Sequence, residues 1–250
     1  MFKGTVTFCA RIKGNGLTFP LCEFNHGEPG VYKVALIGWN GDEILSTVYL
    51  ASVETREAGK ALATKVNTAA LNRISFLHSI AIENDKIAGS QFSPLDPPFE
   101  VQVDAQVHPD TGDYVYVGEA VRLVLGISPE SIKVEIEKPS LPGERYYGLL
   151  RSARQSLSPV EEFVHVYNIL LMLYDDSFMD VDDFILSKDP AVPQTPDPRN
   201  ASRKETVYTR LRHELAHARA GVNIDSTKAE MTKRVSELIA LTKQAIESQP

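Results

Sequence analysis

The residues best suited to chemistry lie close together in one segment near the end of the chain. They are Arg210, Arg212, His213, Glu214, His217 and Arg219. His213 and His217 are four residues apart, which places them about one turn apart on the same face of a helix. Such a pair can bind a metal ion, and a histidine can also transfer protons near neutral pH. We therefore take this segment as the candidate functional site.

Zinc-dependent hydrolysis of a peptide bond is one reaction that these residues could perform. The segment from His213 to His217 matches H-E-x-x-H, in which two histidines bind zinc and the glutamate, here Glu214, is the general base of a metallopeptidase. Glu237, on a following helix, would be the third ligand. However, the longer form of the motif does not continue here, and residues 141–250 show no strand that could hold a peptide. Zinc is therefore the weaker interpretation, and we expect no metal and no cofactor.

The segment must be a helix for either chemistry to work. Val207, Leu211 and Leu215 recur every four residues between the charged positions, so the segment 205–223 has one apolar face. Gly221 stands where a helix commonly ends, because glycine adopts the left-handed conformation of a C-cap at low cost. We therefore expect an amphipathic helix that ends near Gly221.

The helix belongs to an expected four-helix bundle, which begins after a proline-rich boundary near residue 140. The bundle would comprise residues 141–250 and carry the motif on its third helix. The first two expected helices are one at about 144–156 and one that begins at the capping box Ser158-Pro159-Val160-Glu161. A long acidic and proline-rich connection over 175–202 leads to the motif helix. The last helix is expected to begin at a capping box of Thr227 and Glu230 and to run to about Ser248.

Residues 1–140 show the alternating pattern of strands. The expected strands are 2–13, 32–40, 45–53, 99–107, 114–126 and 131–138, with one long helix at about 57–78. Asn40-Gly41 between two of these strands is a strong hairpin signal. The chain is therefore expected to be α+β, with a mostly antiparallel N-terminal domain followed by the helical bundle.

The motif and its surroundings resemble a known family. Arg212 to His217 satisfies R-x4-H with a polar residue after the arginine, which is the signature of HEPN domains. The pattern from Val207 to His217, the glycine break and the long closing helix are similar to the C-terminal half of Apea-like HEPN domains. With Glu205-Thr206 ahead of the motif and a mixed domain before the bundle, the chain also resembles the methylamine-utilisation MauJ family. The similarity covers roughly residues 145–248 and is looser over 1–140.

The resemblance implies a metal-independent ribonuclease. In that chemistry a base takes the 2′-hydroxyl proton of RNA and a cation stabilises the charge on the phosphorus oxygens. Arg212 would bind the phosphate through two parallel donors, and His217 would be the acid or base. His213, which stands where the family most often has asparagine, would orient the ribose or transfer the second proton. Glu214 would hold a histidine tautomer or lie in solvent.

One geometric feature concerns the number of subunits. Residues five apart point about 140° apart on a regular helix, so Arg212 and His217 do not share a face. Either the helix loosens towards Gly221 or two helices form a composite site. The resemblance implies the second, with a homodimer formed through the bundle.

Two further roles stay open for the bundle. One is a non-catalytic module that binds RNA or protein, including an accessory role in methylamine utilisation, and the other is a solvated charged face without function. The N-terminal domain would sense a ligand or bind a protein partner.

The composition of the chain limits its expected ligands and its expected location in the cell. The net charge of −7 argues against a large basic nucleic-acid surface, although the motif helix itself is basic. Cys9 and Cys22 are the only cysteines, and the chain opens directly into a strand pattern, so we expect free thiols and a cytoplasmic location. No apolar run approaches the length of a membrane span.

Overall fold

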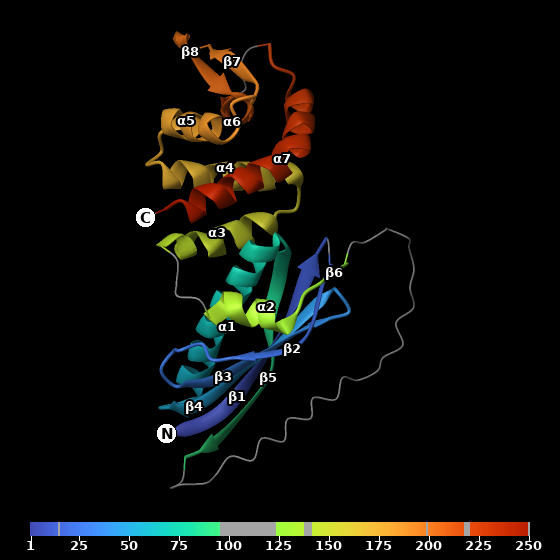
Figure 1. Ribbon diagram of the computed structural model, residues 1–250, viewed down its shortest axis with the longest axis vertical. Helices are drawn as coiled ribbons and strands as arrows, with labels where there is room; N and C mark the ends of the chain where they lie inside the picture. The colour runs from blue at the N-terminus through green and yellow to red at the C-terminus, as the bar shows by residue number, and fades with distance from the viewer. Residues whose placement is uncertain (15, 96–123, 138–141, 199, 218–220, 250) are drawn as a thin grey trace. The chain divides into compact units, whose positions relative to one another are not determined.

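The structure is a computed structural model that describes residues 1–14, 16–95, 124–137, 142–198, 200–217 and 221–249. The chain divides into two compact units, Met1–Thr68 with Glu83–Glu137, and Ala69–Ile82 with Lys138–Pro250. The fold class is α+β, with a mostly antiparallel sheet followed by helices, as expected from the sequence (Figure 1). None of the helices in the described part of the chain is both long enough and apolar enough to cross a bilayer.

The first unit is built on a six-stranded sheet in the order β5-β1-β4-β3-β2-β6. Its strands are β1 (Phe2–Lys13), β2 (Gly16–Phe24), β3 (Val31–Trp39), β4 (Glu43–Val53), β5 (Ala81–Pro94) and β6 (Val124–Gly126). β4 pairs antiparallel with β1 and β3, and β2 pairs antiparallel with β3 and parallel with β6. The strand expected over 2–13 and the hairpin are confirmed. At the hairpin turn both Asn40 and Gly41 have positive φ angles, 50° and 76°, as the tight turn between twisted strands requires.

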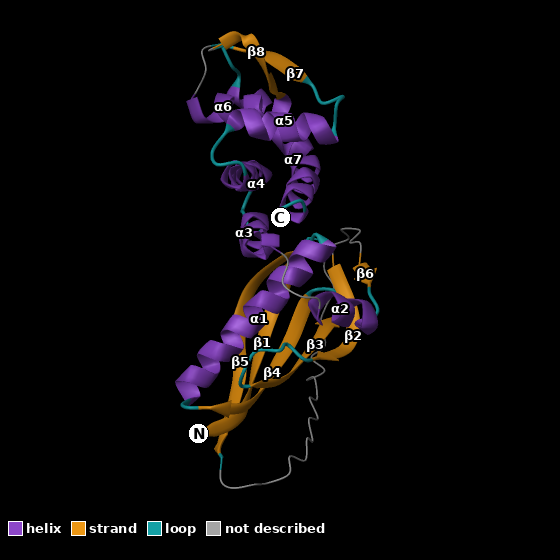
Figure 2. Cartoon of the chain, turned by 60° about the vertical axis from the view of Figure 1, so that its left-hand side comes forward, coloured by secondary structure: helices purple, strands orange, loops and turns teal. Residues whose placement is uncertain are grey.

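Two helices accompany the sheet. The helix expected at about 57–78 is confirmed as α1 (Arg56–His78), whose first part runs along one face of the sheet (Figure 2). There Ser46 of β4 donates a buried hydrogen bond to the side-chain oxygen of Asn67. The second helix, α2 (Pro129–Glu137), lies beside β2, where the Sγ of Cys22 donates to the carbonyl of Pro129 at 3.2 Å.

The helix α2 corrects the strand that was expected over 131–138. The alternation of branched residues at 132, 134 and 136 fits a strand, but Ile132 and Ile136 are buried while Val134 is exposed, as on one helical face. Ser128 caps this helix by accepting the backbone N–H of Ser131 at 3.1 Å, and Pro129 follows as its first residue. The expected strand at 99–107 and most of the one at 114–126 lie outside the described residues. The strands β2 and β5 were not anticipated.

The second unit is helical and surrounds one apolar core. Its elements are residues 69–78 of α1, a short 3₁₀ turn at Pro142–Glu144, α3 (Arg145–Arg154), α4 (Pro159–Leu173), α5 (Phe178–Lys188), β7 (Gln194–Asp197), β8 (Asn200–Thr206), α6 (Val207–His217) and α7 (Ile224–Glu247). The long helices α4 and α7 pack together, with Phe163, Tyr167 and Leu238 fully buried in the core. Ser158 caps α4 by accepting from the backbone N–H of Glu161, as the sequence indicated.

The expected four-helix arrangement is corrected in three places. The described part of this unit has five α-helices of its own, and the motif lies on the fourth. The connection expected over 175–202 contains α5 and most of an antiparallel hairpin, β7–β8, that continues to Thr206, so the unit is not all-α. The last helix is capped by Asn223, which accepts the backbone N–H groups of Asp225 and Ser226, rather than by Thr227 and Glu230.

Candidate functional site

A buried carboxylate fixes the beginning of the motif helix. Asp182 of α5 is 3% exposed. Its Oδ1 accepts from the hydroxyls of Thr206 and Thr209 at 2.7 and 2.6 Å and from the backbone N–H of Thr206 at 3.1 Å. Its Oδ2 accepts from the guanidinium of Arg203 at 2.9 Å. A buried carboxylate is stable only when its oxygens are paired in this way. Asp182 therefore joins α5, β8 and the first turn of α6.

The same network reaches α4 through a tyrosine. The hydroxyls of Tyr167 and Thr209 are 2.6 Å apart, and Thr209 uses its own proton to donate to Asp182, so Tyr167 must be the donor. Burial raises the pKa of Tyr167, an effect that the nearby positive charges of Arg212 and Arg203 reduce. Tyr167 therefore stays protonated and keeps its role as a donor.

His213 lies inside the unit and is bonded to a glutamate that was not among the expected site residues. It is 4% exposed, and its Nδ1 is 2.9 Å from the Oε2 of Glu205, which is fully buried at the end of β8. The ring of Phe178 from α5 contacts the imidazole, with centroids 4.5 Å apart. His213 is thus held by a carboxylate on one side and an aromatic ring on another.

Glu214, the candidate general base of the zinc interpretation, connects helices instead. Its Oε1 accepts from Arg210 and its Oε2 from Thr227, each at 2.8 Å. Arg210 also donates to Glu230 of α7 at 2.6 Å. Burial lowers the pKa of Arg210, but the hydrogen bonds to Glu230 and Glu214 outweigh it and raise the pKa overall. Glu214 is 8% exposed, so it is not the solvated residue that was the other expectation for it.

Arg212 differs from the neighbouring arginines. Arg203, Arg210 and Arg234 each form an ion pair with a carboxylate. Arg212 is half-buried and forms no ion pair with any carboxylate of the described residues, and its buried Nε has no hydrogen-bond partner there. A guanidinium without a carboxylate partner retains its capacity to bind an anion.

His217 is the last residue of α6 and is exposed to solvent. Its ring lies beside that of His213, with centroids 6.0 Å apart. The structure therefore brings the two histidines of the motif together on one face, with Arg212 next to His213 in the helix. Gly221, with φ +80°, adopts the left-handed conformation expected of it.

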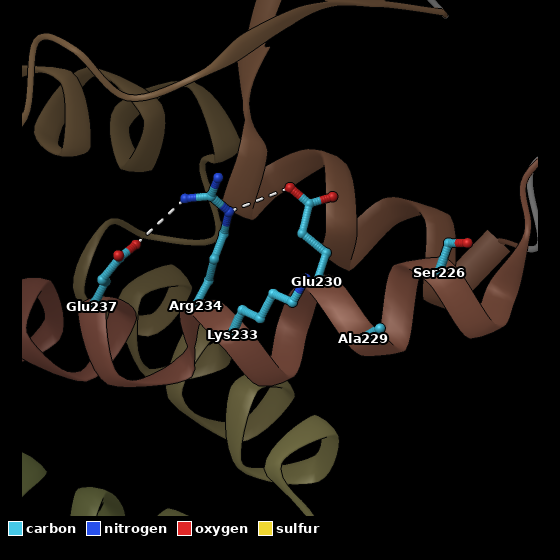
Figure 3. Close-up of a pocket in the computed structure, with 6 residues that line it drawn as sticks. All are labelled: Ser226, Ala229, Glu230, Lys233, Arg234 and Glu237. Atoms are coloured by element: carbon cyan, nitrogen blue, oxygen red, sulfur yellow. Dashed lines mark hydrogen bonds and ion pairs between the residues drawn. The ribbon is translucent and has the colours of Figure 1, made fainter.

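Glu237, the third ligand of the zinc interpretation, is engaged elsewhere. Its Oε2 accepts from the hydroxyl of Tyr208 at 3.0 Å and lies 3.4 Å from a guanidinium nitrogen of Arg234. It borders an open pocket along α7, together with Arg234 and Glu230 (Figure 3). None of the motif residues of α6 lines this pocket. Across the described residues, no three His, Cys, Asp or Glu side chains are placed to hold a metal ion.

The arrangement offers a cation and two imidazoles at the end of one helix. An exposed imidazole can exchange protons with a bound molecule, a second imidazole can act beside it, and an arginine can bind a phosphate or carboxylate. Comparisons of this chain with protein-family models, with curated proteins and with solved structures find no match. The chemistry of the site is therefore inferred from the geometry of its own residues.

Two residues of the site were not identified from the sequence. Glu205 precedes His213 by eight residues and belongs to a strand, so no helical spacing links the two. Asp182 stands among four other aspartates in a segment that was expected to be a connection rather than part of the site. The only local signal is the pair of hydroxyls three residues apart, Thr206 and Thr209, just before the motif.

Proposed function

We propose that the second unit is a HEPN-type module and acts as a metal-independent ribonuclease. The observation that supports this most directly is Arg212, a half-buried guanidinium that has no carboxylate partner among the described residues and stands one position before His213. An arginine in this state favours an anionic ligand, and the phosphate of RNA suits its planar donors.

In the proposed reaction one imidazole removes the proton of a ribose 2′-hydroxyl. The freed oxygen attacks the adjacent phosphorus, and the 5′-oxygen leaves with a proton from the second acid, which yields a 2′,3′-cyclic phosphate and a 5′-hydroxyl. His217 is exposed and serves as one proton-transfer group, His213 is the second, and Arg212 stabilises the charge on the phosphorus oxygens. General acid–base catalysis of this kind contributes roughly 10²–10⁴-fold in rate.

The angular separation of Arg212 and His217 on α6 favours a composite site. The two residues are five apart in a helix that continues to His217, so their side chains leave it about 140° apart. We propose that two copies of the chain pair through the helical unit, so that Arg212 of one copy acts with the histidines of the other. Mixing Arg212→Ala and His217→Ala proteins tests this, since heterodimers would regain one intact site.

The ribonuclease proposal is tested with a fluorescent single-stranded RNA. Arg212→Ala and His217→Ala should each abolish cleavage while the fold is retained, since changes at exposed or half-buried polar residues cost little stability. Arg234→Ala is the matched control, because it removes an arginine that already has carboxylate partners. Cleavage should persist in EDTA. Cleavage that survives in His217→Ala would reject the catalytic proposal.

A non-catalytic binding module is the second candidate, and the burial of His213 favours it. A residue that is 4% exposed has little surface to offer a substrate. In this case the wild type would bind RNA or a protein without cleaving it, and Arg212→Ala would weaken the binding. Gel-shift measurements with the RNA of the cleavage assay separate the two candidates. A zinc peptidase is the weakest alternative, and metal analysis of protein purified without chelator would reveal one zinc per chain if it were correct.

A further inference from the structure

Glu205 completes the candidate site from outside the motif. It is the second-last residue of β8, it is fully buried, and its Oε2 lies 2.9 Å from the Nδ1 of His213. We propose that Glu205 is a positioning residue that holds the proton of His213 on Nδ1 and so leaves Nε2 for the substrate. The catalytic part of this proposal rests on the proposed ribonuclease function, but the bond itself can be measured without any activity.

The position of the proton follows from the chemistry of the pair. An ionised carboxylate can only accept hydrogen bonds, so at 2.9 Å the nitrogen that faces it must carry the proton. The N–H of the imidazole supplies one of the donors that a buried carboxylate needs. With Glu205 ionised, His213 has its proton on Nδ1 whether the ring is neutral or charged. In a neutral ring, Nε2 is then the nitrogen with a free lone pair.

The orientation of the ring follows from its packing. Phe178 contacts the imidazole at a centroid distance of 4.5 Å and an interplanar angle of 58°, which limits rotation of the ring. Among the described residues, Glu205 is the only hydrogen-bond partner of the His213 ring, so no protein group there occupies Nε2. The neighbouring ring on the helical face is that of His217, which is exposed. Nε2 is therefore the atom of His213 that remains for proton transfer.

Fixing a histidine in one tautomer matters for catalysis because the wrong tautomer presents a proton where a lone pair is needed. In hydrolases with a carboxylate behind the histidine, the carboxylate acts in this way and does not itself take the proton. Glu205 would have the same relation to His213. Its removal should lower the turnover rate and leave substrate binding by Arg212 largely unchanged.

The experiment uses nitrogen-15 NMR of the full chain labelled at histidine, with Glu205→Ala and a matched control. Glu214→Ala is the control, since it removes the other glutamate buried beside α6, whose partners are Arg210 and Thr227 rather than a histidine. In the wild type and in the control we expect His213 to be protonated on Nδ1. In Glu205→Ala we expect that proton to be lost from Nδ1 in favour of Nε2. A wild-type His213 without a proton on Nδ1 overturns the proposal, and this result needs no variant to be folded.

Kinetics then separate this proposal from the ribonuclease proposal. Glu205→Ala should lower kcat by roughly 10–100-fold, in line with the loss of a carboxylate that orients a histidine, with KM within about threefold of the wild type. Glu205→Gln should restore part of the rate, because its amide oxygen can still accept from Nδ1. An unchanged kcat in a folded Glu205→Ala rejects the catalytic role of Glu205. If the wild type does not cleave RNA, the ribonuclease proposal is rejected. If NMR nevertheless shows His213 protonated on Nδ1, the Glu205–His213 bond is established all the same.

Discussion

Thr227 of α7 donates a hydrogen bond of 2.8 Å to the Oε2 of Glu214 on α6. The other carboxylate oxygen accepts from Arg210 at the same distance, and Arg210 also donates a hydrogen bond to Glu230 of α7. The glutamate of the H-E-x-x-H pattern therefore joins the motif helix to the helix that follows it. Because both of its oxygens are paired in the protein interior, its contribution is expected in stability rather than in catalysis.

We expect Glu214→Gln to lower the free energy of unfolding by about 1–3 kcal/mol, since the amide oxygen can accept from only one of the two donors, Arg210 and Thr227. Chemical denaturation monitored by circular dichroism measures this difference in the free energy of unfolding. Glu237→Gln, at a side chain that is 60% exposed, should change stability by no more than about 0.5 kcal/mol. The cleavage rate of Glu214→Gln should match that of the wild type. A complete loss of RNA cleavage in a folded Glu214→Gln would contradict the purely structural role of Glu214.

Asp182 should be among the most sensitive positions of the second unit. Asp182→Ala leaves the hydroxyls of Thr206 and Thr209 and the guanidinium of Arg203 without their acceptor, and we expect a loss of about 3–5 kcal/mol. Asp183→Ala is the matched control, because the adjacent aspartate is exposed and should change stability by less than about 0.5 kcal/mol. Equal midpoints in urea for the two variants would contradict the buried network.

The contribution of Glu230 to stability should depend on pH. Burial raises its pKa, but the hydrogen bonds and charges of Arg210 and Arg234 outweigh burial and lower the pKa overall. A carboxyl whose pKa is lower in the folded state stabilises the protein above its unfolded pKa of about 4.3, and this stabilisation is lost as the pH falls through the folded value. Glu230→Gln should therefore be less stable than the wild type at pH 7, with the difference shrinking below about pH 4. A difference that is constant from pH 7 to pH 3 would show that charge is not involved.

The helix α2 can be tested by one buried and one exposed position of similar character. Ile132 is 1% exposed and Val134 is 58% exposed. Ile132→Ala should cost about 2–5 kcal/mol, as is usual for a buried isoleucine, whereas Val134→Ala should be nearly neutral. Thermal unfolding of both variants decides the matter. A strand that buried all three branched residues would make the two substitutions similarly costly.

Local patterns predicted the regular elements well where they contained their own start and stop signals. Ser158-Pro159 marks the beginning of α4, Asn40-Gly41 marks the hairpin, and the four-residue period of α6 is present in the structure. Each of these signals depends on neighbours within a few residues, so it can be recognised without the rest of the fold. The segment Pro129–Glu137 was assigned wrongly because its alternation outweighed an equally local cap.

The partners of the site could not be predicted in this way. The sequence by itself determined that Arg212, His213, Glu214 and His217 share a short amphipathic helix. Only the tertiary structure decided that Glu214 joins two helices and that His213 faces Glu205. These bonds link a strand, a helix and the following helix across sequence separations that no helical or strand period connects. Which polar side chains become buried and paired is set by how the elements pack, because a buried charge is stable only where the fold supplies its partner.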